Sequence, residues 1–343
     1  MLLRALARVF SEDLAVDLGT ANTLVYVRGK GIILDEPSVV ALGRLDQSVL
    51  AVGAEAKAML GRAPGSIRVL RPLLNGVIAD FDVTGRMLKY FIRKAHSRQS
   101  LVYPRIVLAV PSEVTQVEKR AVEAAARAAG AREVYLVEQP MAAAVGAGLP
   151  IESPGAHMIV DIGGGTTEVA IMSLAGIVYG KSLPIAGDEM DEAVIQHMRR
   201  TYNLLIGERH AEEVKIRLGS AAPADNDGAK MDVRGRDLID GFPRSIVVGA
   251  DEIRWALRDP VAAIVAAVHL CLEQAPPELA ADLVDTGIML TGGGALVPGL
   301  DRLLRSETAL PITVSDAPLT CVARGAGRLL DTLDLLRRVA IAT

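Results

Sequence analysis

Two turns rich in glycine and threonine, each preceded by an aspartate, form an internal repeat. Residues 16–27 read VDLGTANTLVYV and residues 160–171 read VDIGGGTTEVAI, with valine, aspartate, glycine, threonine and valine identical at matching positions. Each copy predicts an apolar strand that ends near the aspartate, then a turn, then a second strand. The sequence therefore predicts two hairpins of the same design in the two halves of the chain.

Turns of this kind are suited to binding phosphate. Glycine lets the backbone approach a phosphate oxygen closely, and the N–H groups of the turn supply positive potential. Asp17 and Asp161 stand just before the turns, where a carboxylate can hold a hydrated Mg²⁺ beside the phosphates. Two copies predict two similar lobes that face one nucleotide. The alternative is that both turns are purely structural.

A third glycine turn follows another apolar strand, in the segment Ile288–Ala295, which reads IMLTGGGA. Three consecutive glycines after a strand leave room for a flat ring or a sugar against the backbone. The sequence contains no Walker A motif, and no Gly-x-Gly-x-x-Gly opens a helix. These absences exclude a P-loop protein and a dinucleotide-binding fold of the Rossmann type.

The elements that must position these turns are typical of an α/β protein, with helical stretches between several strands. The strand-like apolar runs are Leu14–Leu18, Leu24–Val27, Ile106–Val110, Val134–Val137, Met158–Ile162, Val169–Met172 and Ile288–Leu290. Thr115 and Glu118 form a capping-box pattern that begins a helix, and Gly130 ends it. A second, amphipathic helix is predicted over Val83–Ala95, and a surface loop over 221–229.

Length and composition narrow the class of protein. A chain of 343 residues predicts two to three domains. The 37 basic and 41 acidic residues give a net charge of −4, which argues against a general nucleic-acid binder. Two cysteines exclude a disulfide scaffold and fit a reducing cytosol. With only five histidines, a Cys/His metal site is also disfavoured.

No segment predicts a membrane-spanning helix, because the longest apolar stretch, Val261–Leu272, falls short of the roughly 20 residues required. Arg4 and Arg8 interrupt the apolar N-terminus, so it is not a signal peptide. On a helical wheel these arginines lie opposite an apolar side that consists of Leu2, Leu3, Leu6, Val9 and Phe10. This pattern is typical of a helix in a membrane interface. The alternative is a tail, or a helix docked on the protein itself.

Together, these motifs resemble the actin/Hsp70/sugar-kinase ATPase superfamily and, within it, the bacterial actin homologues of the MreB family. The closer resemblance runs from about residue 11 to 335. The segments that carry it are Asp17–Thr23, Glu36–Ala41, Gly76–Asp80, Gly130–Glu133, Glu138–Ala144, Asp161–Ala170 and Pro276–Ala280.

The resemblance implies an actin-like α/β fold with two lobes and a nucleotide in the cleft between them. Each lobe would have an inner RNase H-like subdomain and a smaller outer insertion. Lobe I would span residues 11–150, with its insertion at about 31–74. Lobe II would span 151–343, with its insertion at about 186–244. Residues 1–10 would form an amphipathic membrane-binding helix, and Leu101–Tyr103 an apolar tip that touches the membrane.

The resemblance also implies roles for individual residues in binding ATP and Mg²⁺. The first phosphate loop would contain Gly19, Thr20, Ala21 and Asn22, and the second Gly163, Gly164, Gly165 and Thr166. Asp17 and Asp161 would hold the metal through water. Gly292, Gly293, Gly294 and Ala295 would lie against the adenosine. A helix that carries Glu208, His210, Ala211, Glu212 and Lys215 would border the ribose and adenine. On its own, that helix is typical of a solvated ion-pair face.

The catalytic group implied by the resemblance is Gln139, Thr166 and Glu138. The family usually has glutamate at position 139, where the side chain orients the water that attacks the γ-phosphate. Glutamine can hold a water molecule but cannot take its proton, so we expect slowed hydrolysis. His210 stands where the family usually has threonine, and its ring either contacts the ligand or points outward.

The function implied is that of a slow ATPase that polymerises into membrane-associated filaments and directs rod cell shape and cell-wall elongation. Its partners would be further copies of itself, the inner face of the cytoplasmic membrane, cell-wall elongation proteins and membrane-bound adaptors, but not nucleic acid. The alternatives are a small-molecule kinase and an Hsp70-like chaperone. The sequence is short for the kinases and shows no extra acidic base for a substrate hydroxyl, and the chaperone needs a peptide-binding domain after about residue 335.

Overall fold

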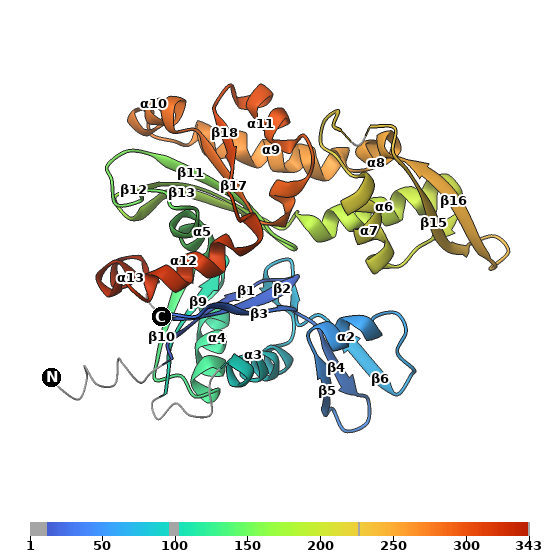
Figure 1. Cartoon of the computed structure of the whole chain (residues 1–343), viewed down its shortest axis with the longest axis horizontal. Helices are drawn as coiled ribbons and strands as arrows, with labels where there is room; N and C mark the ends of the chain where they lie inside the picture. Colours follow the sequence, from blue (N-terminus) through green and yellow to red (C-terminus); the bar gives the residue numbers. More distant parts are fainter. Residues whose placement is uncertain (1–11, 96–102, 226, 342–343) are drawn as a thin grey trace.

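Two five-stranded mixed sheets form the centre of the molecule (Figure 1). The computed structural model describes residues 12–95, 103–225 and 227–341. The first sheet has the order β10 (Glu133–Glu138), β9 (Arg105–Val110), β1 (Leu14–Leu18), β2 (Asn22–Val27) and β3 (Gly31–Pro37). The second sheet has the order β13 (Gly176–Leu183), β12 (Thr167–Ser173), β11 (His157–Ile162), β17 (Ile288–Thr291) and β18 (Ile312–Val314). All seven predicted strands are confirmed.

The sequence repeat is also a repeat of structure. β1 pairs antiparallel with β2 and parallel with β9, and β11 pairs antiparallel with β12 and parallel with β17. Both predicted hairpins are therefore present, each beside a parallel strand. The carboxyl ends of β1 and β11 consequently place their turns at equivalent positions in the two lobes.

Three helices follow strands of the first lobe: α3 (Phe81–Ala95), α4 (Gln116–Ala128) and α5 (Gln139–Ala147). The predicted capping box is confirmed: the Thr115 hydroxyl accepts from Glu118 N, and the Glu118 carboxylate accepts from Thr115 N at 2.8 Å. α3 is the predicted amphipathic helix, and its buried face includes Val83, Met87, Leu88, Phe91 and Ala95.

Smaller sheets lie on the outer side of each lobe, at the right of Figure 1. In the first lobe the sheet consists of β5 (Val49–Val52), β4 (Val40–Gly43) and β6 (Ile67–Leu70), next to α2 (Ala54–Met59). A short hairpin of β7 (Leu73–Leu74) and β8 (Val77–Ile78) follows. β3 belongs to the large sheet, and the outer sheet begins with β4.

In the second lobe the outer sheet consists of β14 (Leu204–Leu205), β15 (Lys230–Asp237) and β16 (Pro243–Gly249). It packs with α6 (Gly187–Tyr202), α7 (Glu208–Leu218) and α8 (Ala250–Ala256). The stretch 221–229 carries no helix or strand in its described residues, as its composition predicted. The remaining helices are α9 (Arg258–Glu273), α10 (Pro277–Thr286), η1 (Gly293–Leu296), α11 (Leu300–Thr308), η2 (Pro318–Thr320), α12 (Cys321–Leu329) and α13 (Leu333–Val339).

The two lobes are joined where α5 and α12 cross between the large sheets (Figure 1). A Cβ atom at Gly325 would overlap the carbonyl oxygen of Ala142, and one at Gly146 would overlap the carbonyl oxygen of Cys321. The helices therefore touch backbone to backbone, and a single apolar cluster contains both helices and residues of both sheets. We call this crossing the hinge end of the molecule.

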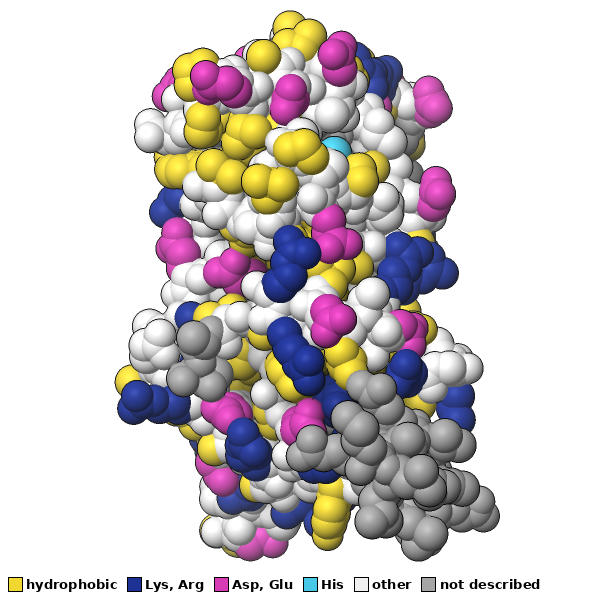
Figure 2. Space-filling view, turned by 90° about the vertical axis from the view of Figure 1, so that its left-hand side faces the viewer, with side chains coloured by type: hydrophobic (Ala, Val, Ile, Leu, Met, Phe, Trp, Pro, Cys, Tyr) yellow, Lys and Arg dark blue, Asp and Glu magenta, His cyan; other side chains and the backbone are white. Residues whose placement is uncertain are grey.

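Among the described residues, no single helix has the length and apolar composition to cross a bilayer. α8 and α9 have this length and composition only when taken together, and the pair is bent by 53°. The predicted N-terminal helix lies outside the described residues, and so do Leu101 and Val102. Tyr103, the last residue of the predicted apolar tip, is 70% exposed. On the face shown in Figure 2, basic and acidic side chains are interspersed across the middle.

Candidate functional site

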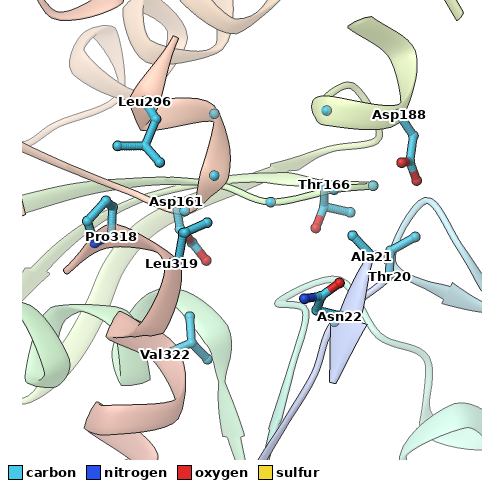
Figure 3. A pocket seen from close by; sticks show the side chains of 18 of the residues that line it. Thr20, Ala21, Asn22, Asp161, Thr166, Asp188, Leu296, Pro318, Leu319 and Val322 are labelled. Atoms are coloured by element: carbon cyan, nitrogen blue, oxygen red, sulfur yellow. The ribbon is translucent and has the colours of Figure 1, made fainter. Parts of the chain in front are cut away.

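A cavity of about 440 Å³ lies between the two large sheets, and the three glycine turns of the sequence meet at its wall (Figure 3). Gly19–Asn22 follows β1, Gly163–Thr166 follows β11, and Gly292–Gly294 follows β17. Parallel neighbouring strands present their carboxyl ends at the same edge of a sheet, and ligands bind at such edges in α/β proteins. The repeat and the third turn therefore belong to one site.

The first two turns are in contact across the cavity. A Cβ atom at Gly164 would lie 2.6 Å from the Ala21 Cβ, and one at Gly165 would lie 2.7 Å from the Thr20 Oγ1. Thr20 Oγ1 also accepts a hydrogen bond from Gly76 N at 3.0 Å, at the tip of the β7–β8 hairpin. A larger residue at Gly164 or Gly165 would therefore collide with the first lobe. Glycine is therefore needed at these positions because the two turns lie so close together. Backbone N–H groups that are exposed in such turns can bind phosphate oxygens.

The third turn and η2 enclose an apolar slot. Gly292 adopts a φ of +78°, and a Cβ atom at Gly294 would overlap the Ile162 side chain. Leu296, at the end of η1, lies on the side of the glycine turn, and Pro318, Leu319 and Val322 line the other side (Figure 3). A narrow slot between a glycine backbone and aliphatic side chains fits a flat ring such as adenine.

Asp17 and Asp161 both line the cavity. Asp17 is partly exposed and Asp161 is buried, and Asp161 lies against the third turn, where a Cβ atom at Gly292 would be 2.7 Å from its Oδ1. Burial and the neighbouring Asp161 carboxylate raise the pKa of Asp17 to about 7, although a hydrogen bond from Gln139 opposes the shift. Burial likewise raises the pKa of Asp161 to about 7, and a bond from Thr291 Oγ1 at 3.1 Å opposes it. Two carboxylates in this environment are stabilised in the ionised form by a nearby cation.

A magnesium ion bound by these two carboxylates would need further ligands. Among the described residues, no three His, Cys, Asp or Glu side chains gather closely enough to hold a metal without other ligands. Mg²⁺ typically keeps several waters and binds one or two carboxylates together with substrate phosphates. The pair Asp17 and Asp161 therefore fits an ion that arrives with a phosphorylated ligand.

Gln139 and Glu138 take different positions, although they are adjacent in the sequence. Gln139 is the first residue of α5, lines the cavity and is 8% exposed. Glu138 is the last residue of β10 and does not line the cavity. Burial raises the pKa of Glu138, and Lys119 partly offsets that effect. Of the predicted catalytic residues, the structure brings Gln139 and Thr166 to the cavity.

Only part of the predicted ribose-binding helix reaches the cavity. Glu212 and Lys215 line it, whereas Glu208 projects outward with a side chain 61% exposed. His210 is held by its own lobe: Nε2 accepts from Arg234 N at 3.2 Å, and Nδ1 lies 3.3 Å from the Glu213 carboxylate. Two predicted alanines also do not line the cavity, because they are packed in the core of the second lobe: Ala211 and Ala295.

Several cavity residues were missed by the sequence reasoning. Asp191 lies 2.9 Å from the Lys215 ammonium, which also donates to the Gly187 carbonyl. Asp35 accepts from the Asn22 amide at 2.7 Å. The other missed residues are Gly76, Asp188 and the apolar slot walls. None belongs to a repeated motif, so no local signal distinguishes them from ordinary surface or core residues.

Comparison with known proteins places the chain in a family. The family model described as MreB/Mbl protein matches residues 11–338. The chain is 53% identical over 340 residues to the cell shape-determining protein MreB of Escherichia coli (strain K12). The aligned residues make up 97% of this chain and 97% of that protein. It is 48% identical over 328 residues to the cell shape-determining protein Mbl of Bacillus subtilis (strain 168), covering 96% of this chain and 98% of that one.

Solved structures agree with the predicted fold. The chain resembles MreB5 of Spiroplasma citri bound to AMPPNP with a TM-score of 0.90 at 37% identity, over 94% of this chain and 97% of the other. It resembles a chain of the MamK double helical filament with a TM-score of 0.79 at 23% identity, over 93% and 99%, which supports the fold alone. The actin-like α/β fold is therefore confirmed, and the chain belongs to the MreB/Mbl family of bacterial actin homologues.

Proposed function

We propose that this chain binds ATP and Mg²⁺ in the cavity, polymerises into filaments and determines rod cell shape. The observation that carries the proposal is the convergence of three distant glycine turns and two aspartates on one cavity. Membership of the family supports it, since relatives are named cell shape-determining proteins and one was solved with AMPPNP.

Each part of the nucleotide has a matching part of the cavity in this proposal. Gly19–Asn22 and Gly163–Thr166 hold the phosphates, and Asp17 and Asp161 hold Mg²⁺ through water. The base lies in the apolar slot, and Glu212 and Lys215 bind the ribose. The basis for this assignment is chemical complementarity: backbone turns for phosphate, carboxylates for a hard cation, and aliphatic walls for a ring.

Slow ATP hydrolysis is the activity that we infer from the side chains near the phosphate turns. Gln139 donates to Asp17, which leaves its Oε1 free to accept a hydrogen bond from a water molecule. Mg²⁺ supplies charge neutralisation when it is bound with the nucleotide. The chain itself contributes positioning, on which phosphoryl transfer mainly depends. Glutamine cannot take the proton of the water, so hydrolysis is slower than with a carboxylate at this position.

The proposed partners are other copies of the chain, the inner face of the cytoplasmic membrane, and cell-wall elongation proteins with their membrane-bound adaptors. Residues 1–10 and the tip Leu101–Tyr103 are the proposed membrane contacts. Their apolar and basic composition supports this, because apolar side chains enter the interface while arginines approach anionic head groups.

Sedimentation tests the proposal against a small-molecule kinase of the same fold. With ATP and Mg²⁺ the full chain is expected to pellet at high speed, and EDTA is expected to keep it in the supernatant. Asp161→Asn should also remain in the supernatant. A wild-type chain that binds ATP yet never pellets would contradict the filament and favour the kinase.

A further inference from the structure

In the described part of the chain, two cations of the first lobe form ion pairs with acids of the second lobe between the outer parts, on the side of the cavity away from the hinge end. Lys57 on α2 donates from Nζ to the Glu212 carboxylate on α7 at 2.9 Å. Arg71, just after β6, donates from Nη1 to the Asp188 carboxylate on α6 at 3.0 Å. Arg71 Nη2 also lies 3.6 Å from Glu208. Both cations come from the first lobe, and all three acids come from the second.

Two of the acidic partners, Asp188 and Glu212, line the nucleotide cavity, whereas Glu208 and the two cations do not. Asp188 is also tied to the second phosphate turn: its backbone N–H donates to the Gly164 carbonyl at 2.7 Å, and that of Gly187 donates to the Gly163 carbonyl at 3.2 Å. Arg71 thus connects the outer sheet of the first lobe, through one side chain, to the turn proposed to hold phosphate.

These pairs are partly shielded from water. The side chains of Arg71 and Asp188 are 20% and 24% exposed, and those of Lys57 and Glu212 are 30% and 35% exposed. Arg71 Nε is buried without a hydrogen-bond partner in the described part of the chain. A guanidinium in this position is stabilised by its acids, and removing them leaves a buried charge. The pairs therefore favour the closed arrangement of the lobes.

The hinge end and the ion pairs lie at opposite ends of the cleft. α5 and α12 are in backbone contact at Gly146 and Gly325, so the two lobes are packed most tightly there. In Figure 1 this crossing is on the left, and α2 and α7 are on the right. A rotation of one lobe about the hinge consequently moves the outer parts farthest, and it must break the two ion pairs.

We propose that Lys57 with Glu212 and Arg71 with Asp188 form an interlobe clasp that opens before nucleotide leaves, and that the clasp sets how long nucleotide remains bound. The inference rests on the proposed nucleotide site and adds its regulation. Lys57 and Arg71 act through the closure of the lobes and touch no part of the cavity themselves, so they are positioning residues.

The rate of nucleotide release tests the proposed effect of the clasp. The full chain is loaded with fluorescent methylanthraniloyl-ADP and Mg²⁺ below the polymerisation concentration, and release is followed in a stopped-flow instrument after addition of excess ADP. Lys57→Ala and Arg71→Gln should each release about threefold faster, and the double variant about tenfold faster, because partly exposed pairs contribute modestly. Arg71→Lys keeps the charge and should stay close to wild type.

Lys94→Ala is the matched control. Lys94 Nζ binds the Glu36 carboxylate at 2.8 Å with similar exposure, but both residues belong to the first lobe. Its release rate should equal that of wild type. Added salt should accelerate release from wild type more than from the double variant, since the ion pairs of the clasp are already absent there.

Two results would overturn the clasp alone: wild-type release by the double variant, or the same acceleration in Lys94→Ala. A wild-type chain that retains no fluorescent nucleotide in Mg²⁺ would overturn the proposed function and the clasp together. The two failures are therefore distinguishable, because only the second removes binding by the unaltered chain.

Discussion

Gln139 Nε2 donates a hydrogen bond of 3.4 Å to Asp17 Oδ1. The bond connects the first residue of α5 to the end of β1, where the first phosphate turn begins. It fixes the orientation of the Gln139 amide, with the nitrogen toward the carboxylate and the oxygen available to accept from water. The residue proposed to orient the attacking water is thus itself oriented by a residue proposed to hold the metal.

Gln139→Glu should raise the single-turnover ATPase rate. A carboxylate accepts hydrogen bonds from water more strongly than an amide. The gain should be well below the ~10²-fold typical of general base catalysis, because phosphoryl transfer needs little base strength. Gln139→Ala should lower the rate. An unchanged or lower rate in Gln139→Glu would show that glutamine is not limiting.

Asp161→Asn and Asp17→Asn should each weaken Mg²⁺-dependent ATP binding by about 10–100-fold, the usual loss when a group that acts through a bound water is removed. Titration calorimetry with and without EDTA measures the effect. In EDTA both variants should bind ATP as well as wild type does. Equal affinities in saturating Mg²⁺ would refute the assignment of the metal to these carboxylates.

The nucleotide-free protein should lose thermal stability as pH rises. The pKa values of Asp17 and Asp161 are raised from 3.8 to about 7 in the folded state, so between these values the folded chain binds more protons than the unfolded chain. The free energy of unfolding therefore falls from about pH 4 to about pH 7, by a few kcal/mol, and levels off above that.

Thermal unfolding in EDTA between about pH 5 and pH 8 tests this dependence. Asp161→Asn removes one of the two carboxylates and should flatten the curve. Asp334→Asn, at a fully exposed position, should keep the wild-type slope. A melting temperature that rises over this range in the wild-type protein would contradict the prediction.

Gly325→Ala should destabilise the protein by about 3 kcal/mol, since the added methyl group meets a backbone oxygen that no side-chain rotation can move. Urea denaturation measures the loss. Gly65→Ala is the control, because a Cβ atom there meets nothing within 4 Å. If both variants unfold at the same urea concentration, α5 and α12 are not in backbone contact.

Deletion of residues 2–10 should abolish flotation of the filaments with anionic liposomes in the presence of ATP. Five apolar side chains would contribute ~1.5–3 kcal/mol each, largely offset by ordering the segment, so single copies bind weakly and filaments bind through many copies. Leu3→Glu/Leu6→Glu should behave like the deletion. Flotation equal to wild type in both would leave the Leu101–Tyr103 tip as the membrane contact.

Local sequence patterns were sufficient to predict the strands and helices and the turns that carry the phosphate-binding residues. The repeat around Asp17 and Asp161 is a local pattern, and strand alternation, glycine turns and the Thr115–Glu118 capping box are also local. Such features depend on residues a few positions apart, so they can be predicted without knowledge of the tertiary structure. The family resemblance then supplied the two-lobed arrangement.

Which side chains share the cavity depends on the packing of distant parts of the chain. It separated Gln139 from Glu138, left Glu208 and His210 outside, and brought in Pro318 and Leu319 as walls of the apolar slot. It also paired Lys57 and Arg71 with acids of the other lobe. These are contacts between residues distant in the chain. They depend on how two sheets close on each other and on the direction in which each side chain leaves its helix or loop, which no local pattern encodes.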